Sequence, residues 1–432
     1  MGADAFGIEY LLSPMSPAEF VESYWAKKPL YVPGTPDKFE RWFHMDFFRE
    51  CVAGTSNHVV DDPVFEKQPE HMIATVPFAN LRSMNAFSAQ FDVLSQLNLN
   101  FIIPTDRFVV EYASTLKREL MYPGQIRAQW WSSPVKGGYP IHFDDWGLFV
   151  LQVAGTKRWK IQKSPSLVWP LAAAGGLGAD GKPEYLGLRS DWERDGAERC
   201  TDADMLTWTL RPGDMLYMPA GVFHSTETLD ERATALHFNF FPARMSEVFH
   251  RFVDDTMTRD VAWRTSPIAY AGSDVRDQAN TEQRVRKMLR ARVAELRRAL
   301  DSETVEDDLF RAWQKMVARH EASGPSYIRY RHKRVESIAA DDRLRVSPRH
   351  PFTSTKIQRP NETVLEIYME DHEVAFDTPE EIAFGENLLV HHAGFRAGDV
   401  VSWKDKAGRA LSWDRAREIM QHLVEIDVLE RG

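Results

Sequence analysis

The sequence predicts a mainly β core flanked by helices. Between about residues 70 and 245, short β-branched and aromatic runs alternate at a period of two and are separated by turn residues. Many short strands at this spacing are typical of an antiparallel sandwich or barrel, not of a parallel α/β sheet. From about 246 to 320 the apolar period becomes helical, and short helices mix with short strands after that. We therefore expect three domains, over residues 1–245 (helical to about 70), 246–325 and 326–432.

Composition excludes several classes of protein. A hydrophobic fraction of 43%, with 13 Trp and 25 Phe, supplies a well-packed core and excludes a mainly disordered chain. The net charge of −10 makes nucleic acid an unexpected partner and suits a polypeptide better. Cys51 and Cys200 stand far apart in no metal-type spacing, which is typical of a reducing cytosol. We find no signal peptide and no apolar run of the ~18 residues that a membrane span needs, so we expect a cytoplasmic protein.

The N-terminal part begins with a capped helix. Ser16 is the predicted N-cap, Pro17 occupies the first helical position, and Glu19 completes a capping box. Pro29 ends this helical stretch, and an extended segment follows. The strands expected beyond it are Phe101–Pro104, Phe108–Tyr112, Arg127–Trp131, Ile141–Val153, Lys157–Ile161, Met215–Met218 and Ala233–Phe241. The Gly- and Ala-rich stretch 172–182 is predicted to be a surface loop.

The helical region carries one apolar stripe among many basic residues. Its members are Val285, Met288, Leu289, Val293, Leu296 and Leu300. The basic residues could bind nucleic acid, but a solvated helix face is the better interpretation because an acidic segment, 301–309, follows. A small helical appendage could hardly bury the stripe alone, so we expect a homodimer through this region.

The last domain is predicted to resemble a winged helix. Thr378-Pro379-Glu380-Glu381 is expected to cap a helix that runs through Leu389, and Ser412 to cap another. Short strands accompany these helices.

Three residues are the candidate metal ligands. On a strand, residues i and i+2 point to the same face, so His142 and Asp144 aim together into whatever cavity that face lines. His224 follows an Arg-Pro-Gly-Asp turn, a strand and a Pro-Ala-Gly turn. Two imidazoles and one carboxylate with open positions form the facial triad of non-haem Fe(II) oxygenases. Because a lone His-x-Asp pair is common, the distal histidine decides this interpretation.

A lysine is the candidate for binding a cosubstrate. In the strand 157–161, Trp159 and Ile161 belong on the inward face, so Lys157 shares that face while Arg158 faces water. A buried lysine needs an anionic partner, which the far carboxylate of a dicarboxylate cosubstrate could supply. The alternative is a lysine at a strand edge whose ammonium group reaches solvent.

Other side chains near these positions are further candidates for the site. Asn239 could donate its amide to the metal-side carboxylate of the cosubstrate, and it shares a strand face with His237. We expect His237 to pack or to hydrogen-bond behind the site rather than to be a fourth ligand. The side chains of Trp130, Trp131 and Trp146 could line a substrate cleft, although tryptophans on strands more often belong to a core.

These motifs resemble a known family. The matching stretches are His142-Phe-Asp144-Asp, Gly155-Thr-Lys157-Arg-Trp159 and Pro212-Gly-Asp214 with Pro219-Ala-Gly221 and His224. Together they look like the JmjC-type, cupin-fold 2-oxoglutarate oxygenases, and within these the ribosomal-oxygenase (cupin-4) branch. The order of a barrel, a helical dimerisation region and a winged-helix domain is similar too.

The resemblance implies a double-stranded β-helix (jelly-roll) barrel with the metal site inside. It implies that His142, Asp144 and His224 bind Fe(II). It also implies that Lys157 binds 2-oxoglutarate and that the Asn239 amide contacts this cosubstrate. The implied reaction is hydroxylation of an amino-acid side chain in a ribosomal protein or another polypeptide, with demethylation of an N-methylated side chain as an alternative. Two other classes remain: a metal-binding cupin that acts as an isomerase or sugar-binding module, and a winged-helix DNA-binding regulator with a silent barrel.

Overall fold

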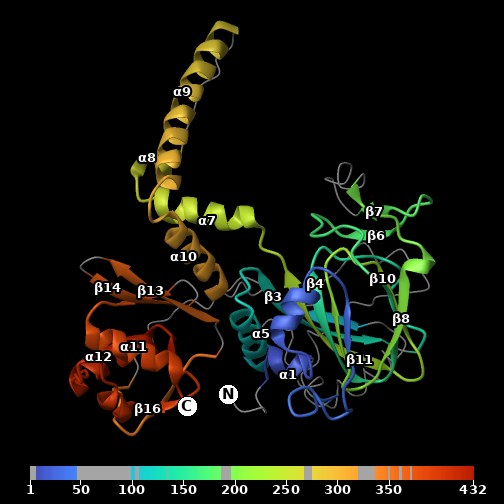
Figure 1. Cartoon of the computed structure of the whole chain (residues 1–432), viewed down its shortest axis with the longest axis horizontal. Coiled ribbons are helices and arrows are strands. Elements are labelled where there is room, and N and C mark those ends of the chain that lie inside the picture. Colours follow the sequence, from blue (N-terminus) through green and yellow to red (C-terminus); the bar gives the residue numbers. More distant parts are fainter. Residues whose placement is uncertain are drawn as a thin grey trace, which may run out of the picture.

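The computed structural model describes residues 6–45, 99–102, 107–133, 135–185, 196–266, 275–319, 336–348, 351–359, 362–369 and 372–432. Figure 1 shows a β-barrel and a C-terminal α/β lobe on opposite sides of helices α7 (Met245–Met257) and α10 (Val305–Ala318).

Two antiparallel sheets form the barrel. The six-stranded sheet has the order β1-β9-β4-β11-β3-β2, and the three-stranded sheet has the order β10-β5-β8. These strands are β1 (Leu30–Val32), β2 (Leu99–Ile102), β3 (Gln125–Ser133), β4 (Gly147–Ala154), β5 (Lys157–Gln162), β8 (Met205–Leu210), β9 (Met215–Met218), β10 (His224–Thr228) and β11 (Ala233–Phe241). The prediction of a mainly β core built from short antiparallel strands is confirmed.

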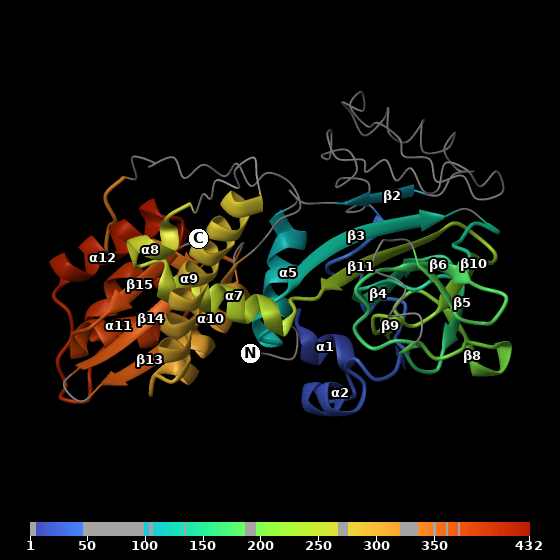
Figure 2. The same cartoon turned by 90° about the horizontal axis from the view of Figure 1, so that it is seen from above.

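The six-stranded sheet buries both of its faces. Leu148, Val150 and Leu216 on its inner face pack against Trp159 and Ile161 of the smaller sheet. Helices α1 (Ile8–Leu12), α2 (Pro17–Ser23) and α5 (Arg107–Glu119) pack on its outer face. The view in Figure 2 separates these helices from the small sheet at the other side of the barrel. The predicted cap of α2 is present, because Ser16 Oγ accepts a hydrogen bond from the Glu19 backbone N–H at 3.1 Å.

Two predicted strands differ from the structure. The strand predicted over Ile141–Val153 is interrupted, because His142 and Phe143 form only isolated bridges and β4 begins at Gly147, so Asp144 lies between the two extended segments. The other difference is in the helix before β3. The segment Phe108–Tyr112 lies in helix α5, not in a strand. The apolar run continues beyond it as Ala113 and Leu116, three residues apart and both buried against the sheet. That spacing is helical, and it outweighs the local β propensity of the preceding residues.

The predicted loop at 172–182 is wrong in part. Its residues contribute to a short hairpin of β6 (Ala174–Leu177) and β7 (Pro183–Tyr185). Ala174 is fully buried and exchanges two backbone hydrogen bonds with Phe143, each of 3.0 Å. Small residues fit here because they allow close approach to the segment that carries His142 and Asp144.

The helical region contains α7, α8 (Val261–Arg264), α9 (Val275–Leu300) and α10. In Figure 1, α9 projects away from both the barrel and the C-terminal lobe. The exposed large apolar side chains of α9 are Met288, Leu289, Val293 and Leu300. Within one chain, therefore, the predicted stripe contacts solvent.

The C-terminal lobe has its own core around two small sheets. Their orders are β16-β12-β17 and β13-β14-β15. The strands are β12 (Arg343–Val346), β13 (Phe352–Arg359), β14 (Glu362–Met369), β15 (His372–Phe376), β16 (Phe395–Arg396) and β17 (Leu429–Arg431), and the helices are α11 (Pro379–Val390) and α12 (Trp413–Glu425). Thr378 and Ser412 cap the two helices as predicted. The winged-helix comparison stays a prediction.

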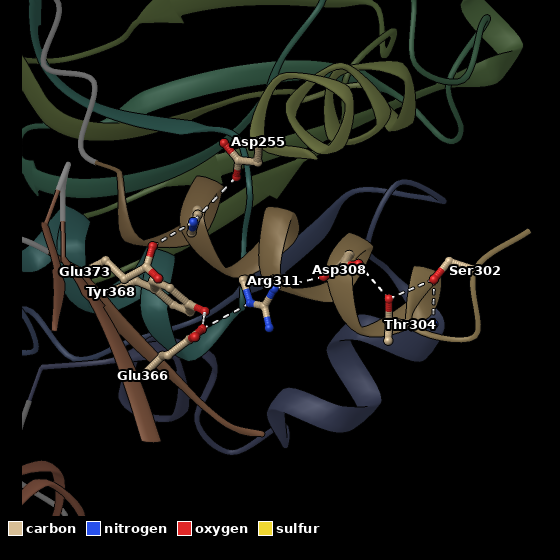
Figure 3. A network of polar contacts seen from close by, with 9 residues as sticks. Asp255, Ser302, Thr304, Asp308, Arg311, Glu366, Tyr368 and Glu373 are labelled. Carbon is tan, nitrogen blue, oxygen red and sulfur yellow. Dashed lines mark hydrogen bonds and ion pairs between the residues drawn. The ribbon is translucent and has the colours of Figure 1, made fainter. Parts of the chain in front are cut away.

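Polar contacts along α10 join the three parts. Arg311 donates to Glu366 on β14 at 3.1 Å and pairs with Asp308 at 2.8 Å (Figure 3). Lys315 pairs with Asp255 of α7 at 3.6 Å and with Glu373 of β15 at 2.8 Å. Toward the barrel, Trp313 Nε1 of α10 donates to the carbonyl of Met121, just after α5. Helix α10 is thus a structural link between the barrel and the C-terminal lobe.

Among the helices that the structure describes, none is both long and apolar enough to cross a lipid bilayer. Cys200 is buried and free of any disulfide. Cys51 lies outside the described residues.

Candidate metal and cosubstrate site

His142, Asp144 and His224 lie close together, beside the start of β10. The carboxylate oxygens of Asp144 lie 4.0 Å from His142 Nε2 and 3.9 Å from His224 Nε2. One donor atom from each of the three residues lies within 4.8 Å of the other two. Two imidazoles and a carboxylate at these separations can chelate one divalent metal ion through a single face.

Both histidines present the same nitrogen to Asp144. His142 Nδ1 donates to the carbonyl of Pro140 at 2.8 Å, and His224 Nδ1 donates to the carbonyl of Val222 at 3.0 Å. A backbone acceptor on Nδ1 fixes the tautomer and leaves the Nε2 lone pair for a ligand. Burial, reinforced by the neighbouring His142, lowers the pKa of His224 well below its ordinary value, so the ring is neutral. Neutral imidazole is the form that binds metals.

The backbone around Asp144 is held by a glycine turn. Gly221 N–H donates to the Asp144 carbonyl at 2.9 Å. Gly221 has φ +77°, and a Cβ there would lie 2.0 Å from the Leu167 carbonyl oxygen, so no other residue fits. Burial raises the pKa of Asp144 to about 6.

Asp214 in the Pro-Gly-Asp motif has a structural role. Its carboxylate is buried and accepts hydrogen bonds from Tyr31 Oη at 2.8 Å, Gly34 N at 3.0 Å and Arg211 N at 2.8 Å. These bonds fix the turn into β9 and connect it to the N-terminal segment.

Lys157 is buried inside the barrel, with 5% of its surface exposed. The outward neighbours Arg158 and Lys160 are exposed, as strand alternation predicts. Lys157 Nζ donates to Ser133 Oγ at 3.0 Å, and Thr228 Oγ1 also contacts this hydroxyl at 3.2 Å. Among the described residues, no carboxylate lies within ion-pair distance of the ammonium group. Burial lowers the pKa of Lys157 to about 8, which is the mark of a buried cation without a counter-charge.

Asn239 lies on the inner face of β11 and is 3% exposed. Its Nδ2 donates to Gln129 Oε1 at 2.7 Å, and Trp131 Nε1 contacts the same oxygen at 3.3 Å. The Asn239 amide is thus oriented by its neighbour on β3. Whether it contacts a cosubstrate stays a prediction.

Aromatic rings surround the triad. A closed series of ring contacts, with centroids 4.1–6.2 Å apart, runs through His142, Tyr139, Trp131, His237, Trp159 and His224. Trp146 packs on Phe241 at 4.8 Å, near the Asp144 segment. That Trp131 and Trp146 line a substrate cleft stays a prediction, whereas Trp130 is fully buried in the outer core.

Three polar residues of the site were not singled out in the sequence: Ser133, Thr228 and Gln129. Ser133 lies two residues from Trp131, so alternation places it on the inner face. Its closeness to Lys157 depends on strand pairing, in which Thr228 is the partner of Lys157 and Ala233 the partner of Ser133. Strand register across such long separations cannot be read from one sequence.

Part of the chain is similar to known proteins. Residues 108–248, which include all five candidate site residues, match the sequence model of the JmjC domain. The chain is 29% identical over 244 residues to the uncharacterized protein YxbC of Bacillus subtilis (strain 168), across 54% of this chain and 70% of YxbC. It is 24% identical over 277 residues to ribosomal oxygenase 2 of Bos taurus, across 59% of this chain. The aligned part spans about half (53%) of ribosomal oxygenase 2.

A solved structure shares the fold. YcfD, a ribosomal oxygenase from Escherichia coli in complex with cobalt and succinic acid, superposes with a TM-score of 0.53 over 97% of this chain and 99% of YcfD. The identity is 15%, so this likeness supports the fold alone. The barrel therefore has the cupin-type fold predicted from the sequence, and the region that carries the triad and Lys157 matches the JmjC domain.

Proposed function

We propose that this protein is an Fe(II)- and 2-oxoglutarate-dependent oxygenase that hydroxylates a side chain of a protein or peptide. The observation that carries the proposal is the pairing of the triad with a buried lysine that has no carboxylate partner among the described residues. The relatives named ribosomal oxygenase support a polypeptide substrate. Fe(II) and 2-oxoglutarate, when bound, would supply the oxidising chemistry that activates O₂ and yields succinate and CO₂.

The residues present fit both groups. His142, Asp144 and His224 would hold the iron, and two imidazoles with one carboxylate are the donor set that non-haem Fe(II) uses. Lys157 would neutralise the far carboxylate of 2-oxoglutarate, with Ser133 and Thr228 beside it as hydroxyl partners. Trp131, Trp159 and the neighbouring rings would exclude water from the cavity.

The two rival classes explain less of the site. An isomerase or sugar-binding cupin would keep the metal ligands but would have no use for the buried ammonium group. A DNA-binding regulator with a silent barrel would not need the Nδ1 hydrogen bonds that orient both histidines toward Asp144.

We further propose that the protein is cytoplasmic and a homodimer through residues 246–325, with a winged-helix-like domain over 326–432. The exposed stripe on α9 supports dimerisation. The boundary near 245 agrees with the start of α7 at Met245.

Mass spectrometry tests the reaction. Candidate polypeptides are incubated with the protein, Fe(II), 2-oxoglutarate and air, and a control lacks 2-oxoglutarate. Hydroxylation adds the mass of one oxygen atom, whereas demethylation removes a methylene unit. Products that form equally without 2-oxoglutarate would contradict the proposal.

A further inference from the structure

Within the described part of the chain, His237 has a buried nitrogen without a hydrogen-bond partner. The residue lies on β11 with 8% of its surface exposed, and its Nε2 makes no hydrogen bond within the described part of the chain. Buried polar side-chain atoms nearly always have a partner, so each exception calls for an explanation. Binding of a ligand to Nε2 would explain why this atom has no protein partner. The residues around His237 indicate which kind of ligand would fit there.

The surroundings argue against a role as a fourth metal ligand. The close group of donor atoms comprises His142, Asp144 and His224, and His237 is not a member among the described residues. The rings of Trp131 and Trp159 lie against His237, with centroids at 5.6 and 6.2 Å. Because these two rings pack against the imidazole, a ligand would have to bind at the nitrogen atoms on its edge.

His237 lies near both the triad and Lys157. The Trp159 ring packs near the rings of both His224 and His237, with centroids 5.8 and 6.2 Å apart. Burial and then the charge of Lys157 lower the pKa of His237 well below its ordinary value. His237 is therefore a neutral imidazole beside a buried ammonium group.

We propose that His237 is a cosubstrate-binding residue whose Nε2–H donates a hydrogen bond to the far carboxylate of 2-oxoglutarate. This inference rests on the proposed function. Lys157 already supplies the one positive charge that the carboxylate requires, and a neutral donor completes its hydrogen bonding without adding a second cation. The carboxylate would in turn satisfy the orphaned nitrogen.

Binding measurements on anaerobic Fe(II)-loaded protein test the assignment without turnover. Calorimetric titrations compare 2-oxoglutarate with pyruvate, which has the same 2-oxo acid group but lacks the far carboxylate. His237→Phe should weaken 2-oxoglutarate binding by about tenfold to a hundredfold, the range for a hydrogen bond to a charged group. Pyruvate affinity and Fe(II) affinity should stay unchanged. His237→Gln, which keeps an amide donor, should retain most of the 2-oxoglutarate affinity.

Several results would overturn the inference. One is 2-oxoglutarate affinity in His237→Phe within about threefold of wild type. Another is an equal loss for pyruvate, which would indicate general disruption of the cavity. A loss of Fe(II) affinity would make His237 a metal ligand instead. If His237→Phe does not fold, His237→Leu takes its place. Wild-type protein that binds Fe(II) but not 2-oxoglutarate would refute the proposed function itself, a result distinct from these.

Discussion

His142 and His224 are joined by two backbone hydrogen bonds. His142 N–H donates to the His224 carbonyl at 3.0 Å, and His224 N–H donates to the His142 carbonyl at 2.8 Å, in an isolated antiparallel bridge. Their ring centroids are 4.1 Å apart. Residues from two distant segments are thus held together by the main chain. The triad is therefore built into the fold before any metal binds, which favours tight and oriented binding.

Replacing Lys157 tests the binding of the cosubstrate. Lys157→Ala leaves the far carboxylate of 2-oxoglutarate buried and unpaired, at a cost of about 3–5 kcal/mol by analogy with broken buried ion pairs. The affinity should fall by roughly two to three orders of magnitude, while Fe(II) affinity stays the same. Titration calorimetry measures both. Arg158→Ala is the matched control, because Arg158 is exposed and pairs with Glu227 on the barrel surface. An equal effect of the two variants would refute the role of Lys157.

The affinity for 2-oxoglutarate should depend on pH through Lys157. Burial lowers the pKa of this lysine to about 8, and the groups that face it are the hydroxyls of Ser133 and Thr228 and the neutral ring of His237. The ammonium form attracts the carboxylate, so affinity should be highest below about pH 8 and fall by up to about tenfold per pH unit above it. Lys157→Arg keeps its charge at all these pH values, so its affinity should show no such decline. A parallel decline in both proteins would assign the titration to another group.

Replacing Asp214 tests the turn before β9. Asp214→Ala leaves Tyr31 Oη and two backbone N–H groups without their acceptor, and we expect a loss of about 3 kcal/mol or more in the free energy of unfolding. Asp214→Asn keeps one acceptor oxygen and should lose less. Urea unfolding measures the difference. Equal stability of all three proteins would show that these bonds contribute little.

The apolar stripe on α9 predicts the assembly. Leu289 and Val293 are 52% and 51% exposed, so Leu289→Asp should disrupt a dimer without harming the fold of the monomer. Light scattering at micromolar concentration should show a dimer for the wild type and a monomer for the variant. Arg286→Asp, which changes charge at an exposed position of the same helix, is the control. A monomeric wild type would contradict the prediction.

The sequence predicted those features that depend on local spacing. Alternation placed Lys157 on the inner face of β5 and Arg158 on the outer face, and both helix caps in the C-terminal lobe follow from Thr378 and Ser412. The sequence-based prediction failed where local and tertiary signals compete. In α5, the segment Phe108–Tyr112 has strand propensity, but it continues into the helical spacing of Ala113 and Leu116.

The partners of the site residues were beyond sequence reasoning. Gln129 meets Asn239 because β3 pairs with β11 in a particular register, and Ser133 meets Lys157 of β5 where the two sheets face each other. Register depends on the packing of both faces of the sheet, which no single strand encodes.

Conversion of 2-oxoglutarate to succinate, measured with and without Fe(II), tests the central claim most directly. The wild type should form succinate only with Fe(II), and a chelator should stop it. Asp144→Ala should bind no Fe(II) and form no succinate, because the carboxylate between the two histidines is lost. Asp145→Ala, which changes the adjacent carboxylate, should keep Fe(II) binding. Succinate formation by Asp144→Ala at the wild-type rate, or by the wild type without any metal, would contradict the account.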